Sequence, residues 1–155
     1  TGVDVTMELF KVAATHQIPV YCLGAAPGVA QRAIDNVSAQ VGALNIAGIH
    51  DGFFDSAEEQ EIIKSIADSK AKLVFVALGV PKQEQWIAEK LSHLDGVVAI
   101  GIGGSFDVLA GNIPRAPEWM QQNRLEWLYR LYLEPQRIGR MLAIPKFMWT
   151  VIRNK

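Results

Sequence analysis

Three arginines near the carboxyl end of the chain have the chemistry and the spacing to bind phosphate groups. Arg130, Arg137 and Arg140 are seven and three residues apart, which can place them along one face of a helix. A guanidinium group donates paired hydrogen bonds to phosphate oxygens. The surrounding residues are rich in Leu, Trp, Tyr, Met and Phe, which indicates contact with apolar material. This arginine ladder predicts a diphosphate-bearing substrate that is handled near a membrane.

A second chemical feature is a set of four glycine-containing loops, each of which follows an apolar run. They span residues 24–28, 50–54, 79–83 and 101–107. Glycine lets the backbone approach a ligand closely, and the helix after each loop offers N–H groups to an anion. In an open parallel sheet such loops meet at the carboxyl edge, where ligands bind. The candidate site residues on these loops are Phe53, Gly79, Lys82, Gln83, Gly103, Phe106 and Asp107.

Several of these side chains also have a plain structural interpretation. Asp107 either accepts hydrogen bonds from a ribose or base, or caps the short helix that follows it. Phe53 and Phe106 either stack on a base or pack in the core. The amide of Gln83 can donate and accept toward a sugar hydroxyl, but Gln83 and Lys82 are also typical solvated residues at the start of a helix.

The standard nucleotide and metal motifs do not fit this sequence. Residues 101–106 have Phe where a dinucleotide fingerprint needs its third glycine, and residues 79–82 lack the spacing and hydroxyl of the NTPase phosphate loop. The three histidines, His16, His50 and His93, lack partner ligands at useful spacing, and no Asp-x-Asp pair is present. We therefore expect neither NAD-type redox chemistry nor ATP hydrolysis, and no metal.

The elements that must position these residues alternate along the chain. We expect strands over residues 19–24, 44–49, 72–78 and 97–102. We expect an opening amphipathic helix that contains Val3, Met7, Phe10 and Ala14, and further helices over about 28–41, 56–69 and 81–91, the second opened by a capping box of Ser56 and Glu59. Continuous apolar strands are typical of a parallel sheet covered on both faces. The pattern predicts a Rossmann-like α/β fold with strand order 2-1-3-4.

Charge divides the chain into two parts. Residues 1–112 hold 7 basic and 13 acidic side chains, whereas residues 113–155 hold 8 basic and 3 acidic ones, so a body of net charge −6 precedes a segment of net charge +5. We expect a Rossmann-like nucleotide-sugar-binding domain over 1–112 and a helical, basic and aromatic appendage over 113–155. The basic part indicates an anionic partner, although a solvated basic helix has the same composition.

Two features bear on the compartment. The single cysteine, Cys22, lies in an apolar run, which predicts a buried strand thiol in a reducing cytoplasm. The apolar stretch over 138–152 is interrupted by Pro145 and Lys146, so it is too short and polar to cross a bilayer but suited to lie on one. We expect a cytoplasmic protein bound peripherally to the inner face of the cell membrane, with no nucleic-acid partner.

Three segments resemble the WecG/TagA/CpsF glycosyltransferase family. They are VALGVPKQEQWI (76–87), GIGGSFDVLAG (101–111), and RAPEWM followed by LEWLYRL (115–120 and 125–131). The opening Thr-Gly-Val-Asp and the Asp-Gly-Phe-Phe of residues 51–54 are similar too. Members of this family transfer a sugar, typically N-acetylmannosamine or its uronic acid, from a UDP donor to a polyprenyl-diphosphate-linked sugar. Their products feed the synthesis of teichoic acid and other cell-envelope polysaccharides.

The resemblance also implies roles for individual residues. Gln83 would help to hold the reacting sugars, Asp107 with its glycine-rich loop would contact the uridine, and Phe53 would lie beside the base. The arginine ladder matches the arginines of the family's C-terminal appendage, which closes over the donor diphosphate and docks on the membrane. The family is regarded as inverting and metal-independent, so no cofactor is expected and cations would stabilise the departing UDP.

The sequence departs from the family at the proposed catalytic base. That Asp belongs to an Asp-Gly segment upstream of the Thr-Gly-Val-Asp region, and neither Asp4 nor Asp51 matches its position. We therefore expect the chain to be the later portion of a longer protein and a poor catalyst alone, because losing a general base removes a factor of about 10²–10⁴ in rate. The alternative is a non-catalytic module that binds UDP or a lipid diphosphate.

Overall fold

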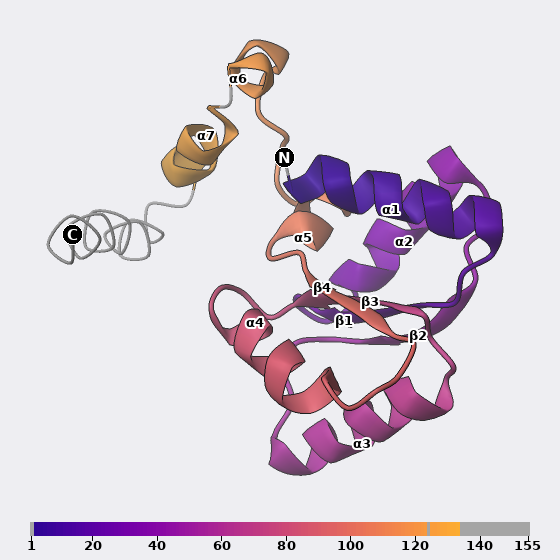
Figure 1. Ribbon diagram of the computed structural model, residues 1–155. Coiled ribbons are helices and arrows are strands. Elements are labelled where there is room, and N and C mark those ends of the chain that lie inside the picture. Colours follow the sequence, from indigo (N-terminus) through magenta and orange to yellow (C-terminus); the bar gives the residue numbers. More distant parts are fainter. Residues whose placement is uncertain (1, 124, 134–155) are drawn as a thin grey trace, which may run out of the picture. The chain divides into compact units, whose positions relative to one another are not determined.

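The computed structural model describes residues 2–123 and 125–133, which are coloured in Figure 1. The chain divides into two compact units, residues 1–114 and residues 115–155. The first unit contains the sheet and the helices that cover it. The second contains two short helices within its described part.

The first unit is built on a four-stranded parallel sheet with the order β2-β1-β3-β4. Its strands are β1 (Val20–Gly24), β2 (Ile46–His50), β3 (Leu73–Ala77) and β4 (Val98–Gly101). Every residue of β1 and β3 is buried, because these central strands are covered on both faces. The predicted α/β fold class and strand order are confirmed.

Two helical layers enclose the sheet (Figure 1). One face is covered by α1 (Gly2–His16), α2 (Val29–Val41) and α5 (Ser105–Leu109), and the other by α3 (Ser56–Asp68), α4 (Lys82–Trp86) and the π-helical turn η1 (Ile87–Leu91). The first layer buries a core around Phe10, Phe75 and Phe106, and the second buries one around Tyr21 and Trp86. Each helix after a strand therefore starts at the carboxyl edge of the sheet.

The start of α3 differs by one residue from the predicted capping box of Ser56 and Glu59. Asp55 is the N-cap: its Oδ1 accepts hydrogen bonds from the backbone N–H groups of Ala57 (2.8 Å) and Glu58 (3.0 Å). Glu58 Oε2 in turn accepts from the backbone N–H of Asp55 at 3.0 Å. Two overlapping capping patterns were present in the sequence, and the ionised carboxylate is a suitable acceptor at a helix N-terminus. The prediction of Ser56 as the cap was wrong.

The lone thiol agrees with its interpretation from sequence. Cys22 is fully buried in the centre of β1. Burial raises the pKa of the Cys22 thiol far above its ordinary value, because the thiolate would lose its hydration. The prediction of a buried strand thiol is confirmed.

The second unit begins at Arg115 and contains α6 (Glu118–Gln122) and α7 (Glu126–Leu133). Arg115 Nε lies 3.5 Å from Glu126 Oε1, which ties the entry of the unit to α7. Arg130 belongs to α7, but its side chain lies outside the described part of the structure, as do Arg137, Arg140 and the whole 138–152 stretch. No described helix has the length and apolar character needed to cross a bilayer.

Candidate functional site

At the carboxyl edge of the sheet, hydrogen bonds join the four glycine-containing loops in two pairs. The loop after β1 is bonded to two neighbours: the Ala25 N–H donates to Ala77 O of β3 at 3.0 Å, and the Gly52 N–H donates to Ala25 O at 2.8 Å. The loop after β4 is bonded to the helix after β3, because the Gly103 N–H donates to Gln83 Oε1 at 3.0 Å. The expectation that these loops converge on one edge is confirmed.

Gly24 makes the first of these junctions possible. Its φ of +117° is rarely adopted by other residues, and a Cβ at this position would lie 2.5 Å from the carbonyl oxygen of Ala77. The two backbones therefore pass each other at a distance that leaves no room for a side chain. The site is built on this close approach between β1 and β3.

Gln83 lies inside the protein. Its side chain is 2% exposed, its Oε1 accepts from Gly103, and its Nε2 donates to Glu84 Oε1 at 2.8 Å. The interpretation of Gln83 as a solvated helix residue is therefore wrong. Gly79 lies one turn earlier, with φ +79°, and its carbonyl oxygen accepts from the Gln83 N–H at 2.9 Å. Whether Gln83 holds a sugar stays a prediction.

The two candidate stacking residues are in opposite environments. Phe53 is 73% exposed on the loop after β2. Phe106 is fully buried in the core between α5 and the sheet, so it has no face to offer to a base. The interpretation of Phe106 as a ligand-stacking residue is corrected to a core residue, because the first turn of α5 points it inward. Of these two residues, Phe53 is the one whose ring is accessible to a ligand.

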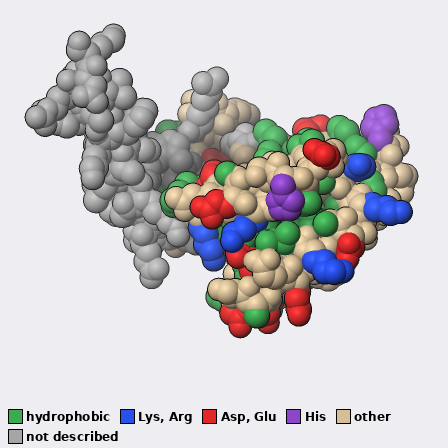
Figure 2. Space-filling model, turned by 60° about the horizontal axis from the view of Figure 1, so that its bottom comes forward, with side chains coloured by type: hydrophobic (Ala, Val, Ile, Leu, Met, Phe, Trp, Pro, Cys, Tyr) green, Lys and Arg blue, Asp and Glu red, His purple; other side chains and the backbone are tan. Residues whose placement is uncertain are grey.

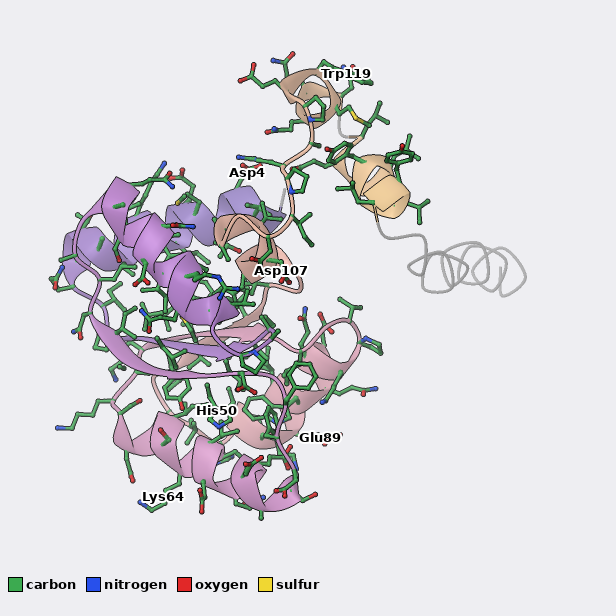
Figure 3. All side chains as sticks on the ribbon, turned by 180° about the vertical axis from the view of Figure 1, so that it is seen from behind. Asp4, His50, Lys64, Glu89, Asp107 and Trp119 are labelled. Atoms are coloured by element: carbon green, nitrogen blue, oxygen red, sulfur yellow. The ribbon has the colours of Figure 1, made fainter. Side chains whose placement is uncertain are left out.

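Asp107 lies in the first turn of α5 and is partly exposed. The N-cap of α5 is Gly104, which makes no side-chain cap, so the interpretation of Asp107 as the capping residue is wrong. Its backbone oxygen accepts from Asn112 (2.9 Å) and Ile113 (3.2 Å), which fixes the main chain around it. Figure 3 places Asp107 on the same side of the sheet as Asp4, whereas His50 lies on the side of α3.

Lys82 is positioned by an aromatic ring. Its Nζ lies 5.5 Å from the centroid of the Phe54 ring, within the range of a cation–π interaction. Phe54 in turn meets His50 and Trp86 edge to face, with centroids 6.0 and 6.4 Å apart. The ammonium group of Lys82 therefore lies over the Phe54 ring of an aromatic row formed by His50, Phe54 and Trp86. It adds positive charge at the carboxyl edge of the sheet.

Glu59, Trp86 and Lys90 form a hydrogen-bonded network next to the aromatic row, and the sequence alone did not predict it. Glu59 Oε1 accepts from Trp86 Nε1 at 2.8 Å, and Glu59 Oε2 lies 2.9 Å from Lys90 Nζ. The hydrogen bond from Lys90 lowers the pKa of the Glu59 carboxyl below its ordinary value, and the bond from Trp86 acts in the same direction. Because the partners lie 27 and 31 residues away, no local spacing could have revealed them. The network fastens α3 to α4 and η1.

We expect the substitution Glu59→Gln to reduce stability at neutral pH and to have little effect in acid. A carboxyl whose pKa is lowered by folding stabilises the protein above its unfolded-state pKa, and this contribution is lost as the pH falls through the folded-state pKa. The loss should reach up to about 1 kcal/mol near pH 7 and disappear near pH 2. Urea unfolding followed by Trp fluorescence measures it, with Glu61→Gln as the control on the same helix. Equal losses at both pH values would contradict the assignment.

The surface charges of the first unit are mixed. On the face shown in Figure 2, acidic and basic side chains of the described residues are interspersed with apolar ones and form no continuous basic patch. Within residues 2–123 and 125–133, no group of three or more His, Cys, Asp or Glu side chains is arranged to hold a metal ion. Beside the loops, Lys82 is a single basic group, and the amino ends of the helices add partial positive charge.

An open parallel sheet that is covered by helices on both faces and has its glycine-containing loops at the carboxyl edge defines a Rossmann-like α/β protein. More narrowly, the chain belongs to the WecG/TagA/CpsF family of glycosyl transferases, whose model matches residues 1–155. The family resemblance expected from residues 76–87 and 101–111 is confirmed.

Three curated relatives carry the same name, N-acetylglucosaminyldiphosphoundecaprenol N-acetyl-beta-D-mannosaminyltransferase. The protein of Bacillus subtilis is 40% identical over 154 residues, that of Bacillus spizizenii 40% over 155 residues, and that of Staphylococcus aureus 33% over 154 residues. Each alignment covers 99% of this chain. The chain spans 59% of the two Bacillus proteins and 60% of the Staphylococcus protein.

Proposed function

We propose that the protein takes part in transferring a hexosamine-type sugar, N-acetylmannosamine or its uronic acid, from a UDP donor to a polyprenyl-diphosphate-linked sugar. The observation that carries this proposal is the gathering of four loops, hydrogen-bonded in two pairs, at the carboxyl edge of the sheet in a chain that belongs to a glycosyl transferase family. The names of the relatives describe such a transfer to an N-acetylglucosaminyl diphosphoundecaprenol acceptor. The products would be cell-envelope polysaccharides.

Each site residue is proposed to bind a different part of the UDP-sugar donor. Phe53 offers an exposed ring to the uracil, and Asp107 offers a carboxylate to the ribose or base from the first turn of α5. Lys82 and the arginine ladder supply positive charge to the diphosphate. As the glycosidic bond to the donor breaks, negative charge grows on the departing UDP, and guanidinium groups stabilise that charge without a metal. Transfer with inversion at the anomeric carbon is part of the same proposal.

The direct test is calorimetric titration of the 155-residue chain with UDP and with NAD. UDP should bind and NAD should not, because residues 101–106 lack the third glycine that a dinucleotide needs for close approach. Transfer of N-acetylmannosamine from its UDP donor to a prenyl-diphosphate-linked N-acetylglucosamine then tests the reaction itself. NAD binding without UDP binding would overturn the proposal in favour of an oxidoreductase.

Replacing Arg137 with Ala tests the arginine ladder. One guanidinium–phosphate pair contributes about 1.5–3 kcal/mol, so affinity for UDP should fall by roughly 10–100-fold. Affinity for uridine, which has no phosphate, should not change. The matched control is Arg153→Ala, which removes the same charge from the same unit outside the ladder. An unchanged affinity of Arg137→Ala for UDP would exclude the ladder from the site.

The basic and aromatic appendage is proposed to hold the protein on the cytoplasmic membrane face, where its lipid-linked acceptor lies. We expect a chain cut after residue 112 to lose co-sedimentation with vesicles that contain anionic lipid, since each basic residue near such a surface contributes about 1 kcal/mol. High salt should weaken the binding of the uncut chain. If the truncated chain still sediments with these vesicles, the first unit and not the appendage makes the membrane contact.

A further inference from the structure

Gln83 is a long polar side chain that the sheet domain buries almost completely. It lies in the first turn of α4 and is 2% exposed. Both ends of its amide are engaged within the protein: Oε1 accepts from the Gly103 N–H, and Nε2 donates to Glu84 Oε1. A buried amide is retained at little cost only when such partners exist. One acceptor position and one donor position of this amide are used within the protein, and at 2% exposure the side chain has little surface to offer to a sugar.

The Gln83 oxygen bonds to the segment that follows β4, just beyond the end of the sheet. Between β3 and β4, Val76 is paired with Gly101, and the Ile102 N–H donates to Val76 O at 2.9 Å. β3 then ends at Ala77. In a parallel ladder only alternate N–H groups of a strand face the same neighbour, so the Gly103 N–H, which comes directly after that of Ile102, is not part of the β3–β4 ladder. Its acceptor is the side-chain oxygen Gln83 Oε1, at 3.0 Å.

Gly101 provides the space that this side chain occupies. A Cβ on Gly101 would lie 2.5 Å from Gln83 Nε2, 2.8 Å from its Cδ and 3.0 Å from its Cγ. Contacts this short force the flexible amide to move, and a moved amide cannot keep its bond to Gly103. Gly101 and Gln83 are therefore complementary positions, separated by eighteen residues in the sequence.

The bond from Gln83 controls the turn that leads to Asp107. Gly103 has φ +53°, and just after it Ser105 closes the turn with two hydrogen bonds to Ile102 O, from its N–H at 3.2 Å and its Oγ at 2.7 Å. The turn is thus held from α4 on one side and by Ser105 on the other. α5 starts directly after it and carries Asp107.

We propose that Gln83 is a positioning residue of the donor site, which acts through Gly103 to place Asp107, and that Gly101 is the position that makes this possible. The ligand that depends on it is the uridine part of the donor, so this inference rests on the proposed function. Direct contact between Gln83 and the sugar predicts a defect only when the sugar is present. Action through the turn predicts a defect with UDP alone.

The test compares UDP affinity of the full 155-residue chain and three variants by calorimetry. Gln83→Met removes the acceptor while keeping the length of the side chain, and Gly101→Ala displaces the amide without removing it. Both should weaken UDP binding by about tenfold, the effect of losing one buried hydrogen bond. Gln85→Met, at an exposed position of the same helix, should bind UDP as the wild type does. Weaker binding of the UDP-sugar together with unchanged binding of UDP would overturn the proposal.

Amide hydrogen exchange supplies a readout that does not depend on the ligand. In Gln83→Met and Gly101→Ala the Gly103 amide should exchange at least about tenfold faster, while the Ile102 amide, bonded to Val76, keeps its protection and reports an intact sheet. In a Gln83→Ala background, Gly101→Ala should have little further effect, because no amide is left to displace. If wild-type chain fails to bind UDP, the proposed function fails, and unchanged exchange at Gly103 separately overturns the positioning role.

Discussion

Gly24→Ala is expected to destabilise the sheet domain by about 2–5 kcal/mol. A side chain in the left-handed region costs about 1–2 kcal/mol, and forcing two packed backbones apart costs a further ~1–3 kcal/mol. Here the obstacle is the carbonyl oxygen of Ala77, 2.5 Å from the new Cβ, and backbone of a central strand cannot move aside as a side chain would. A loss of this size is a large part of the stability of a typical domain. Urea unfolding measures it.

Gly42→Ala is the matched control. Gly42 also has a positive φ, +93°, but no atom lies within 4 Å of the position that a Cβ would take, so only the backbone strain applies. We expect a loss of about 1–2 kcal/mol from strain alone. If the two substitutions cost the same, the close approach of β1 to β3 contributes nothing.

Gly24→Ala should also change the structure of the proposed ligand site. Ala25 follows Gly24 directly, and its N–H and carbonyl oxygen hold the ends of β3 and the loop after β2. Moving Gly24 away from Ala77 lengthens the first of these bonds and shifts Ala25, so the loop that carries Phe53 loses its anchor at Gly52. We therefore expect UDP affinity of Gly24→Ala to fall even at temperatures where the variant is still folded.

The fold could be predicted from sequence because its signals are local. The strands β1 and β3 are continuous apolar runs, and such runs separated by amphipathic helices specify a covered parallel sheet. Predicted strand limits differed from the structure by one or two residues, because strand ends are the least sharply marked part of an apolar run. The cap of α3 was misplaced because two capping patterns overlap at Asp55 and Ser56.

The site was only partly predictable, because its decisive contacts join distant residues. The four loops could be located from glycine and the ends of apolar runs. The burial of Gln83 could not, since it depends on Gly101 and Gly103, which come from another strand and the loop after it. Likewise Phe53 and Phe106 have similar local sequences, and only the packing of α5 against the sheet buries the second ring.

Phe53→Ala and Phe106→Ala are expected to separate binding from stability. Removing the exposed Phe53 ring should change the free energy of unfolding by less than about 0.5 kcal/mol, as for most surface substitutions. If that ring stacks on the uracil, UDP affinity should fall by roughly 5–150-fold, corresponding to about 1–3 kcal/mol for one stacked base. Removing the buried Phe106 ring should cost about 3–5 kcal/mol of stability. Urea unfolding and calorimetric titration with UDP measure the two effects.

The comparison between these variants depends on the ligand used. Stacking acts on the base, so Phe53→Ala should weaken uridine, UDP and the UDP-sugar by the same factor, whereas Phe53→Trp should restore most of the lost affinity because a larger ring keeps the stacking face. Phe106→Ala should reduce affinity through the fraction of unfolded protein and, in the folded fraction, only as far as loss of the ring shifts α5 and Asp107. Unchanged affinity of Phe53→Ala for all three ligands would mean that the base lies elsewhere on the edge of the sheet, with Asp107 as the remaining candidate contact.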